Sequence, residues 1–188
     1  VQTCALPIFH PLEREILESG RVVVPPGLDA GGKPHHVRLY SVASSSQGET
    51  GRDTISICVR RCFYIDEISG ERYPGRASNY LCDAQPGDTI EITGPYGSHF
   101  QMPPSMDRNM LMVGAGTGIA PFRAFIRRIA EERGGWKGKV RLFYGARTGM
   151  EMLYMNDIEK DMALYYDDKS FKAFEAVSAR PHFDQIGR

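Results

Sequence analysis

The feature that most constrains the fold is an apolar run, a glycine turn and an amphipathic segment, in that order, between residues 109 and 133. The stretch "NMLMV" (109–113) has the uninterrupted apolar character of a buried parallel strand. After the turn "GAGTG" (114–118), apolar residues recur at helical spacing through "IAPFRAFIRRIAEER" (119–133). This order of strand, glycine turn and helix predicts the start of an α/β unit.

The residues that follow repeat the pattern. We predict a strand over 139–146, a helix over 151–166 and a third strand over 171–178, and therefore a parallel sheet with right-handed crossovers. The glycine spacing is G-x-G-x-G, which is neither G-x-G-x-x-G nor a P-loop. The turn still favours a phosphate at the helix N-terminus, and a merely tight strand–helix connection is the alternative.

Residues 20–100 follow a different pattern, in which short strands alternate with turns rich in glycine and proline. The runs "RVVV" (21–24) and "VRLYSVA" (37–43) predict a hairpin around a long loop. Further elements are predicted as a strand over 54–65, a short helix over 78–84 opened by Ser78, and a strand within 85–97. We expect a small antiparallel barrel, with the domain boundary near "MPPSMD" (102–107).

Composition excludes several classes of function. The chain has 23 acidic and 23 basic residues, so its zero net charge does not indicate binding to nucleic acid or to an acidic membrane. The longest apolar stretch, 110–122, is broken by three glycines and is too short for a membrane helix. Four cysteines without a CxxC pair predict no metal site and no disulfide framework, which suits a cytoplasmic location. Cys58 and Cys62 are expected to pack on one face of a strand.

Polar residues follow the predicted strands of the second half where each strand ends. Arg147 comes after the second strand, and Ser178 and Arg180 come after the third. Ligands of parallel sheets bind at these ends, and a guanidinium suits a phosphate. An additional phosphate would indicate the 2′-phosphorylated nicotinamide dinucleotide, whereas scattered surface arginines are the alternative.

In the first half, Arg38 and Tyr40 lie two residues apart, about 6.6 Å along a strand. A cation there can hold a phosphate while the ring lies against an aromatic ligand, and Ser41 can hydrogen-bond the edge of that ligand. Gly75 and Ser78 near a helix start offer a second seat for an anion. The alternative is structural: a solvated arginine, a packed tyrosine and a serine-rich loop.

Six ordered motifs carry a family resemblance: "RLYSVASS" (38–45), "CVRRCFY" (58–64), "GRASNYLCD" (75–83), "GPYG" (94–97), "GAGTGIAPFRAF" (114–125) and "YGARTGMEMLY" (144–154). Together they resemble the plant-type ferredoxin–NADP⁺ reductases, from about Gly20 to Asp184. The loop "PPGLDAGGKPH" (25–35) is similar too.

The resemblance implies an antiparallel β-barrel domain that binds FAD (residues 9–105), followed by a truncated α/β parallel-sheet domain that binds NADP (residues 106–184). In the FAD domain, Arg38, Gly75 and Ser78 would hold the pyrophosphate. Tyr40 would stack on the isoalloxazine, Ser41 would lie near the flavin N5, and Tyr64 would stack on the adenine end. Ser41 and Tyr40 are therefore the residues implied for catalysis.

In the NADP domain, the resemblance implies that the glycine turn cradles the cofactor through Gly114, Gly116, Thr117 and Gly118. Arg147, Ser178 and Arg180 would bind the 2′-phosphate, and Arg60 matches a basic position near the nucleotide. The family usually has Ser followed directly by Arg, whereas Ala179 intervenes here, which weakens the 2′-phosphate assignment. The family's later motifs, a strand cysteine near the nicotinamide and a terminal aromatic, are absent.

The implied reaction passes electrons from NADPH through FAD to a one-electron iron–sulfur acceptor. Ferredoxin, flavodoxin or a fused iron–sulfur domain would be the partner. Two segments, "YGARTGMEMLYMND" (144–157) and "FKAFEAVSARPHF" (171–183), resemble the reductase component of bacterial benzoyl-CoA epoxidase more closely still. A flavin-binding electron-transfer subunit that does not oxidise a nicotinamide, and a fragment that is inactive alone, are further alternatives. The preference for NADPH over NADH and the oligomeric state stay open.

Both ends have an unusual composition. The segment "VQTCALPI" (1–8) can be back-translated to a common sequencing adapter read in frame, and "QIGR" (185–188) to its reverse complement. We therefore expect a fragment of a reading frame and base no functional argument on these residues.

Overall fold

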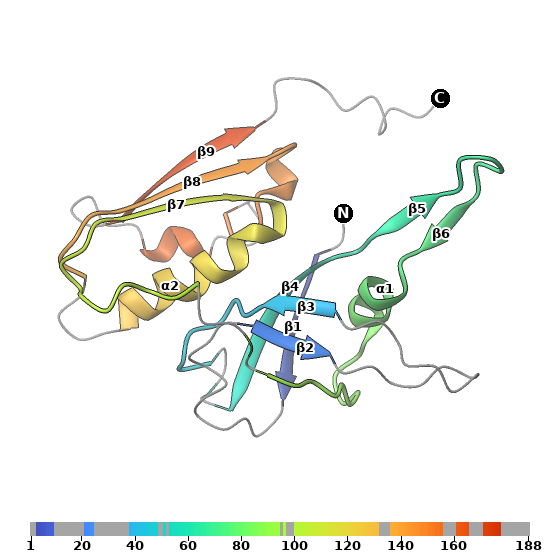
Figure 1. Ribbon diagram of the computed structural model, residues 1–188, viewed down its shortest axis with the longest axis horizontal. Coiled ribbons are helices and arrows are strands. Elements are labelled where there is room, and N and C mark those ends of the chain that lie inside the picture. Colours follow the sequence, from blue (N-terminus) through green and yellow to red (C-terminus); the bar gives the residue numbers. More distant parts are fainter. Residues whose placement is uncertain are drawn as a thin grey trace. The chain divides into compact units, whose positions relative to one another are not determined.

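The computed structural model describes residues 3–9, 21–24, 38–48, 51, 53–94, 96, 100–131, 136–155, 161–165 and 171–177. The chain divides into two compact units, residues 1–101 and 102–188. Figure 1 shows strands and one short helix in the first unit, and a three-stranded sheet with a longer helix in the second.

The described strands of unit 1 form antiparallel pairs. β1 (Thr3–Phe9) pairs with β4 (Thr54–Arg60), β2 (Arg21–Val24) pairs with β3 (Arg38–Ser41), and β5 (Phe63–Ile65) pairs with β6 (Arg72–Pro74). The β2–β3 pairing confirms the predicted hairpin. An isolated bridge between Val42 and Ile57 connects the end of β3 to β4.

Three predicted elements of unit 1 are wrong in detail. The strand expected over 54–65 is interrupted after Arg60 and resumes at Phe63, and Cys62 in the gap is exposed while Cys58 is buried. The helix α1 (Arg76–Asp83) begins after Gly75, so Ser78 lies inside its first turn. The described part of 85–97 contains a turn and a single bridge residue, Thr93, in place of a strand.

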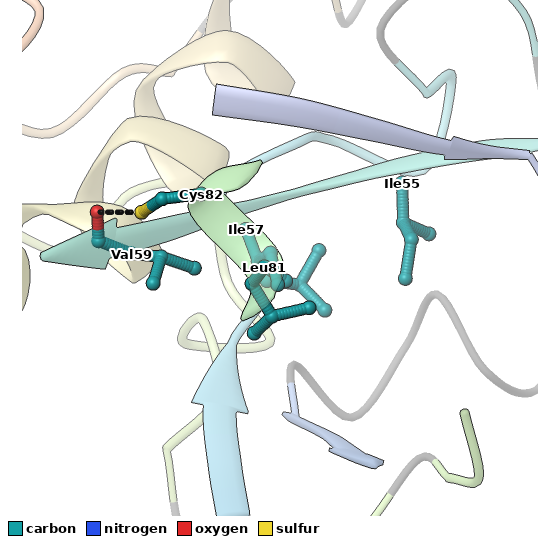
Figure 2. Close-up of a cluster of buried hydrophobic side chains, with 6 residues drawn as sticks. Ile55, Ile57, Val59, Leu81 and Cys82 are labelled. Atoms are coloured by element: carbon teal, nitrogen blue, oxygen red, sulfur yellow. Dashed lines mark hydrogen bonds between the residues drawn. The ribbon is translucent and has the colours of Figure 1, made fainter. Parts of the chain in front are cut away.

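The core of unit 1 lies between β4 and α1. Ile55, Ile57 and Val59 of β4 form a buried cluster with Leu81 and Cys82 of α1, and Figure 2 shows the three β4 side chains on one side of the strand. The thiol of Cys82 lies 4.0 Å from the carbonyl oxygen of Val59, a weak hydrogen bond. Val42 completes the buried cluster, against which Tyr40, Ile90 and Ile92 pack at its edge.

Unit 2 contains the predicted parallel sheet. Its strands β7 (Met110–Ala115), β8 (Val140–Ala146) and β9 (Phe171–Val177) lie in that order, and both pairings are parallel. A short 3₁₀ segment, η2 (Gly116–Ile119), leads from β7 into α2 (Ala120–Glu131). The predicted order of strand, glycine turn and helix is therefore confirmed (Figure 1).

Within the described residues, one face of the sheet is buried and the other is exposed, which corrects the expectation of a fully buried first strand. Met110, Met112 and their neighbours on that face are buried, whereas Leu111 and Val113 of the same strand are 71% and 69% exposed. On the exposed face, the rings of Phe143 and Phe174 stack with their centroids 4.7 Å apart. An apolar run predicts that a strand is in a sheet, but it does not predict which faces are covered.

The helix predicted over 151–166 is also wrong within the described residues. The short 3₁₀ segments η3 (Gly149–Glu151) and η4 (Met162–Tyr165) stand there, and residues 152–155 form turns. Tyr154 has φ +63°, a left-handed conformation that ends any helix. The amide of Met162 donates to the carbonyl oxygen of Tyr154 at 3.0 Å, which ties the two segments together.

Two glycines of unit 1 offer a matched test of packing. Gly48 and Gly70 have φ of +72° and +71°, but a Cβ at Gly48 would lie 1.7 Å from the carbonyl oxygen of Gly51, whereas a Cβ at Gly70 meets nothing within 4 Å. Gly70→Ala should lower the free energy of unfolding by about 1–2 kcal/mol through backbone strain alone. Gly48→Ala should cost about 2–5 kcal/mol, because the clash adds to the strain. Denaturant unfolding measures both, and equal losses would contradict the close approach at Gly48.

Candidate functional site

The glycine turn of unit 2 opens directly from the carboxyl end of β7. Gly116 has φ +52°, and a Cβ built on Gly116 or Gly118 would meet nothing within 4 Å. At Gly114, by contrast, a Cβ would lie 3.1 Å from the ring of Phe122 in α2. Gly114 therefore allows helix and strand to pack, while Gly116 and Gly118 leave the backbone accessible. An open glycine backbone at the start of a helix suits a phosphate.

The hydroxyl of Tyr144 fixes the shape of this turn. The residue is 1% exposed, and its hydroxyl donates to the carbonyl oxygen of Gly116 at 3.0 Å. The Tyr144 hydroxyl oxygen also accepts the amide hydrogen of Leu153 at 3.1 Å, and it lies 3.3 Å from the carbonyl oxygen of Glu151. One buried hydroxyl thus joins β8, the glycine turn and the segment after η3.

Arg147 lies just beyond the end of β8, as the sequence predicted. Its Nε and Nη2 groups donate to the two carboxylate oxygens of Glu151, at 3.1 and 2.9 Å. The Arg147 side chain is 39% exposed and that of Glu151 only 11%. The pairing has no signal in the sequence beyond the separation of four residues, which is the usual one for ion pairs in helical segments.

A buried cation that the sequence analysis did not single out lies on α2. Arg123 is 5% exposed, forms an ion pair with Asp161, and lies over the ring of Tyr154 with 4.6 Å between its Cζ atom and the ring centroid. A buried charge is tolerated only when it is paired, so these contacts hold the segment after β8 against α2. Its role in the fold is therefore to position that segment.

In unit 1, Arg38 and Tyr40 lie on β3 as predicted. Arg38 is exposed, and Tyr40 is half-buried against the core cluster that includes Leu81 and Cys82 of α1. Burial raises the pKa of Tyr40, and the nearby Arg38 guanidinium partly offsets that rise. The phenol therefore stays protonated at neutral pH. The Tyr40 ring and the Arg38 cation lie close together, an arrangement that suits a ligand with both an aromatic ring and a phosphate.

The junction between β4 and β5 is bound to the start of α1. The amide of Gly75 donates to the carbonyl oxygen of Cys62 at 2.9 Å, and the Ser78 hydroxyl accepts the amide hydrogen of Cys62 at 3.0 Å. Asn79 donates from Nδ2 to the carbonyl oxygens of Cys62 and Gly75, at 2.8 and 2.7 Å. The Ser78 side chain thus has a structural task, and the amides of the first turn of α1 are left to meet an anion.

The adjacent arginines 60 and 61 differ in environment. Arg61 donates to Asn79 at 2.9 Å and to Asp83 at 2.6 Å, so it links the end of β4 to α1. The Arg61 hydrogen bond lowers the pKa of Asp83 below its usual value. Arg60, which the resemblance assigns to the nucleotide, is exposed at the end of β4.

Tyr64 lies on a two-stranded arm formed by β5 and β6. Its ring stacks on Tyr73, with centroids 5.1 Å apart and an angle of 17° between the planes. On the same arm, the Arg72 guanidinium of β6 lies 3.6 Å from the ring centroid of Phe63 in β5. Tyr64 is 59% exposed, so its outer face is available to a ligand ring.

The serine-rich loop after β3 proves structural. Ser44 and Ser45 are buried, and the Ser44 hydroxyl accepts the amide hydrogen of Ser56 at 3.1 Å. The Ser45 hydroxyl accepts that of Gln47 at 3.2 Å. For these two serines, the structural alternative is therefore correct.

The described site residues lie on the following elements. Tyr40 of β3 packs against the core cluster that includes Leu81 and Cys82 of α1, and Arg147 follows β8, the strand paired with the one that leads into the glycine turn. Ser178 and Arg180 lie outside the described residues. Among the described residues there is no cluster of three or more His, Cys, Asp or Glu side chains that could hold a metal. No helix in the described part is long and apolar enough to cross a membrane.

An open glycine turn between a parallel strand and a helix is typical of nucleotide-binding α/β domains, and residues 112–187 match the family model "Oxidoreductase NAD-binding domain". The ferredoxin–NADP reductase of Synechocystis sp. is 42% identical over 170 residues, covering 88% of this chain and 40% of the relative. That of the Cyanophora paradoxa cyanelle is 45% identical over 142 residues, covering 73% of this chain and 39% of the relative.

Solved structures show the same fold. A ferredoxin–NADP⁺ reductase from Plasmodium falciparum with 2′P-AMP superimposes with a TM-score of 0.72 at 21% identity, covering 95% of this chain and 66% of that one. The chain belongs to the ferredoxin–NADP reductase family. It spans about 40% of the length of the curated relatives it matches.

The buried hydroxyl of Tyr144 can be tested by removing it. Tyr144→Phe leaves the Gly116 carbonyl without this donor, while the Leu153 amide keeps its contact with the carbonyl oxygen of Glu151. We expect the free energy of unfolding to fall by about 2 kcal/mol, the cost of a buried polar group left unsatisfied. Tyr80→Phe, at a residue 58% exposed, is the control and should change stability by less than about 0.5 kcal/mol. Equal effects in denaturant unfolding would contradict the role of the Tyr144 hydroxyl.

The raised pKa of Tyr40 predicts a loss of stability in alkali. The unfolded chain releases this phenol proton near pH 10 and the folded chain only at higher pH. The contribution of Tyr40 to stability is therefore present below about pH 10 and falls as the pH rises toward the folded pKa. The unfolding free energy of Tyr40→Phe should decline less steeply over this window than that of the wild type and of Tyr80→Phe. Parallel slopes would refute the prediction.

Proposed function

We propose that this chain is the nucleotide-binding part of an enzyme that transfers electrons between NADPH and ferredoxin through FAD. In this proposal, unit 1 closes into an antiparallel barrel and binds FAD, while unit 2 binds NADP(H). The observation that carries the proposal is the open glycine turn between β7 and α2, in a chain 42% identical to a ferredoxin–NADP reductase over 88% of its length. A cytoplasmic location and a ferredoxin partner belong to the same proposal.

The residues of unit 1 fit FAD. The exposed Arg38 guanidinium and the first amides of α1, which Gly75 precedes, are the groups that would hold the pyrophosphate. A Cβ at Gly75 would lie 3.1 Å from the carbonyl oxygen of Cys62, so a glycine there lets the backbone fold closely onto the end of β4. Tyr64 offers an exposed ring for the adenine.

Tyr40 and Ser41 would act at the reactive end of the flavin. FAD, when bound, would accept a hydride from the nicotinamide and release the electrons one at a time. The half-buried Tyr40 ring would cover one face of the isoalloxazine and exclude water from it. The Ser41 hydroxyl would hold a hydrogen bond at N5 and so orient the ring.

The residues of unit 2 fit NADP(H). The backbone of Gly116, Thr117 and Gly118 at the start of α2 would receive the pyrophosphate, with room that a Cβ at either glycine would reduce. Arg147 would meet the 2′-phosphate, together with Ser178 and Arg180. No observation within the described residues favours the oxygenase-reductase alternative, which stays a hypothesis from sequence.

Titration with FAD tests the proposal. We expect the purified chain to quench flavin fluorescence on binding, and Arg38→Ala to weaken binding about tenfold, since a charge-assisted hydrogen bond is lost. Arg128→Ala, which removes an exposed arginine from α2, is the matched control and should bind as the wild type does. A folded chain that binds no FAD, or an Arg38 variant that binds it normally, would contradict the proposal. Bleaching of the bound flavin by NADPH then tests the reaction.

A further inference from the structure

The Arg147–Glu151 pair places a negative charge at the point where unit 2 is proposed to meet a 2′-phosphate. The carboxylate engages the Nε and Nη2 groups of the guanidinium together, at 3.1 and 2.9 Å. A second anion that binds Arg147 must therefore share the guanidinium with Glu151. The carboxylate is 11% exposed, so water screens it poorly.

Glu151 is held in place by its own backbone. Its amide donates to the carbonyl oxygen of Thr148 at 3.0 Å, and its carbonyl oxygen accepts the amide hydrogen of Leu153, also at 3.0 Å. The Tyr144 hydroxyl lies 3.3 Å from the same carbonyl oxygen. These contacts fix the backbone of Glu151 at the position from which its carboxylate reaches Arg147, so the negative charge stays close to the guanidinium.

Resting on the proposed function, we propose that Glu151 determines cofactor specificity by reducing the preference of Arg147 for a 2′-phosphate over a 2′-hydroxyl. The reason is electrostatic. A 2′-phosphate is a dianion, which the guanidinium attracts and the neighbouring carboxylate repels. A 2′-hydroxyl carries no charge and responds little to either group. Glu151 thus brings the affinities for phosphorylated and unphosphorylated dinucleotides closer together.

The chain contains a matched control for this inference. Arg127 and Glu131 of α2 form an ion pair at 3.6 Å with the same spacing of four residues. Glu131→Gln therefore changes the net charge of unit 2 as Glu151→Gln does, but away from the glycine turn. Glutamine keeps the volume of the side chain and can still accept a hydrogen bond from the arginine.

The experiment measures binding of 2′,5′-ADP and 5′-ADP to the whole chain by calorimetry. Glu151→Gln should bind 2′,5′-ADP about three- to tenfold more tightly and 5′-ADP within about twofold of the wild type. Raising the salt concentration should reduce this gain in affinity for 2′,5′-ADP, because the repulsion that the variant removes is electrostatic. Glu131→Gln should leave both affinities unchanged, and Arg147→Ala should weaken 2′,5′-ADP alone.

The outcomes separate the two proposals. If the wild type binds neither nucleotide, the proposed function fails, and the inference that rests on it fails as well. If both nucleotides bind but Glu151→Gln leaves their affinity ratio unchanged or weakens 2′,5′-ADP, the specificity role is overturned while the function stands. Circular dichroism and thermal unfolding check that each variant is folded. Should Glu151→Gln not fold, Glu151→Ala, which also removes the negative charge, must still show a raised ratio of affinity for 2′,5′-ADP over 5′-ADP.

Discussion

The geometry of unit 2 depends on one buried hydroxyl. Tyr144 stands on the central strand of the sheet, and its oxygen meets the carbonyl of Gly116 and the amide of Leu153. The strand is held in place because both of its edges are paired. Through its hydrogen bonds, the Tyr144 hydroxyl therefore restrains the glycine turn and the segment after η3. A phosphate site built from backbone amides needs such support, because glycine itself contributes no side chain to hold the turn.

Unit 1 solves a similar problem with backbone groups. The gap between β4 and β5 leaves the amide and carbonyl of Cys62 without strand partners, and Gly75, Ser78 and Asn79 satisfy both. The start of α1 is therefore fixed to the end of β4 by hydrogen bonds in a part of the chain that is half-exposed. Arg61 adds a second link through Asn79 and Asp83. Hence the first amides of α1 have a defined position although no side chain caps the helix.

Predictions from sequence succeeded where one local pattern decides the outcome. The β2–β3 hairpin, the parallel sheet and the glycine turn before α2 each follow from residues close together in the chain. The prediction of a helix over 151–166 was wrong because Tyr154 takes a left-handed conformation. The ring of Tyr154 also contacts Arg123, a residue far from it in the sequence. Ser78 was expected to open α1, yet its hydroxyl is used by Cys62, sixteen residues earlier. Long-range partners of this kind leave no periodic signal.

The sequence by itself determined the two classes of unit, the positions of the glycine turn and the strand ends, and the residue types that can bind phosphate and aromatic rings. These properties depend on periodicity and on the chemistry of single residues. The tertiary structure alone decided that Glu151 neutralises Arg147, that Ser44 and Ser45 serve the backbone, and that, within the described residues, one face of the parallel sheet is buried and the other is exposed. Each of these depends on which groups compete for the same partner or the same surface, and that competition exists only once the chain has folded.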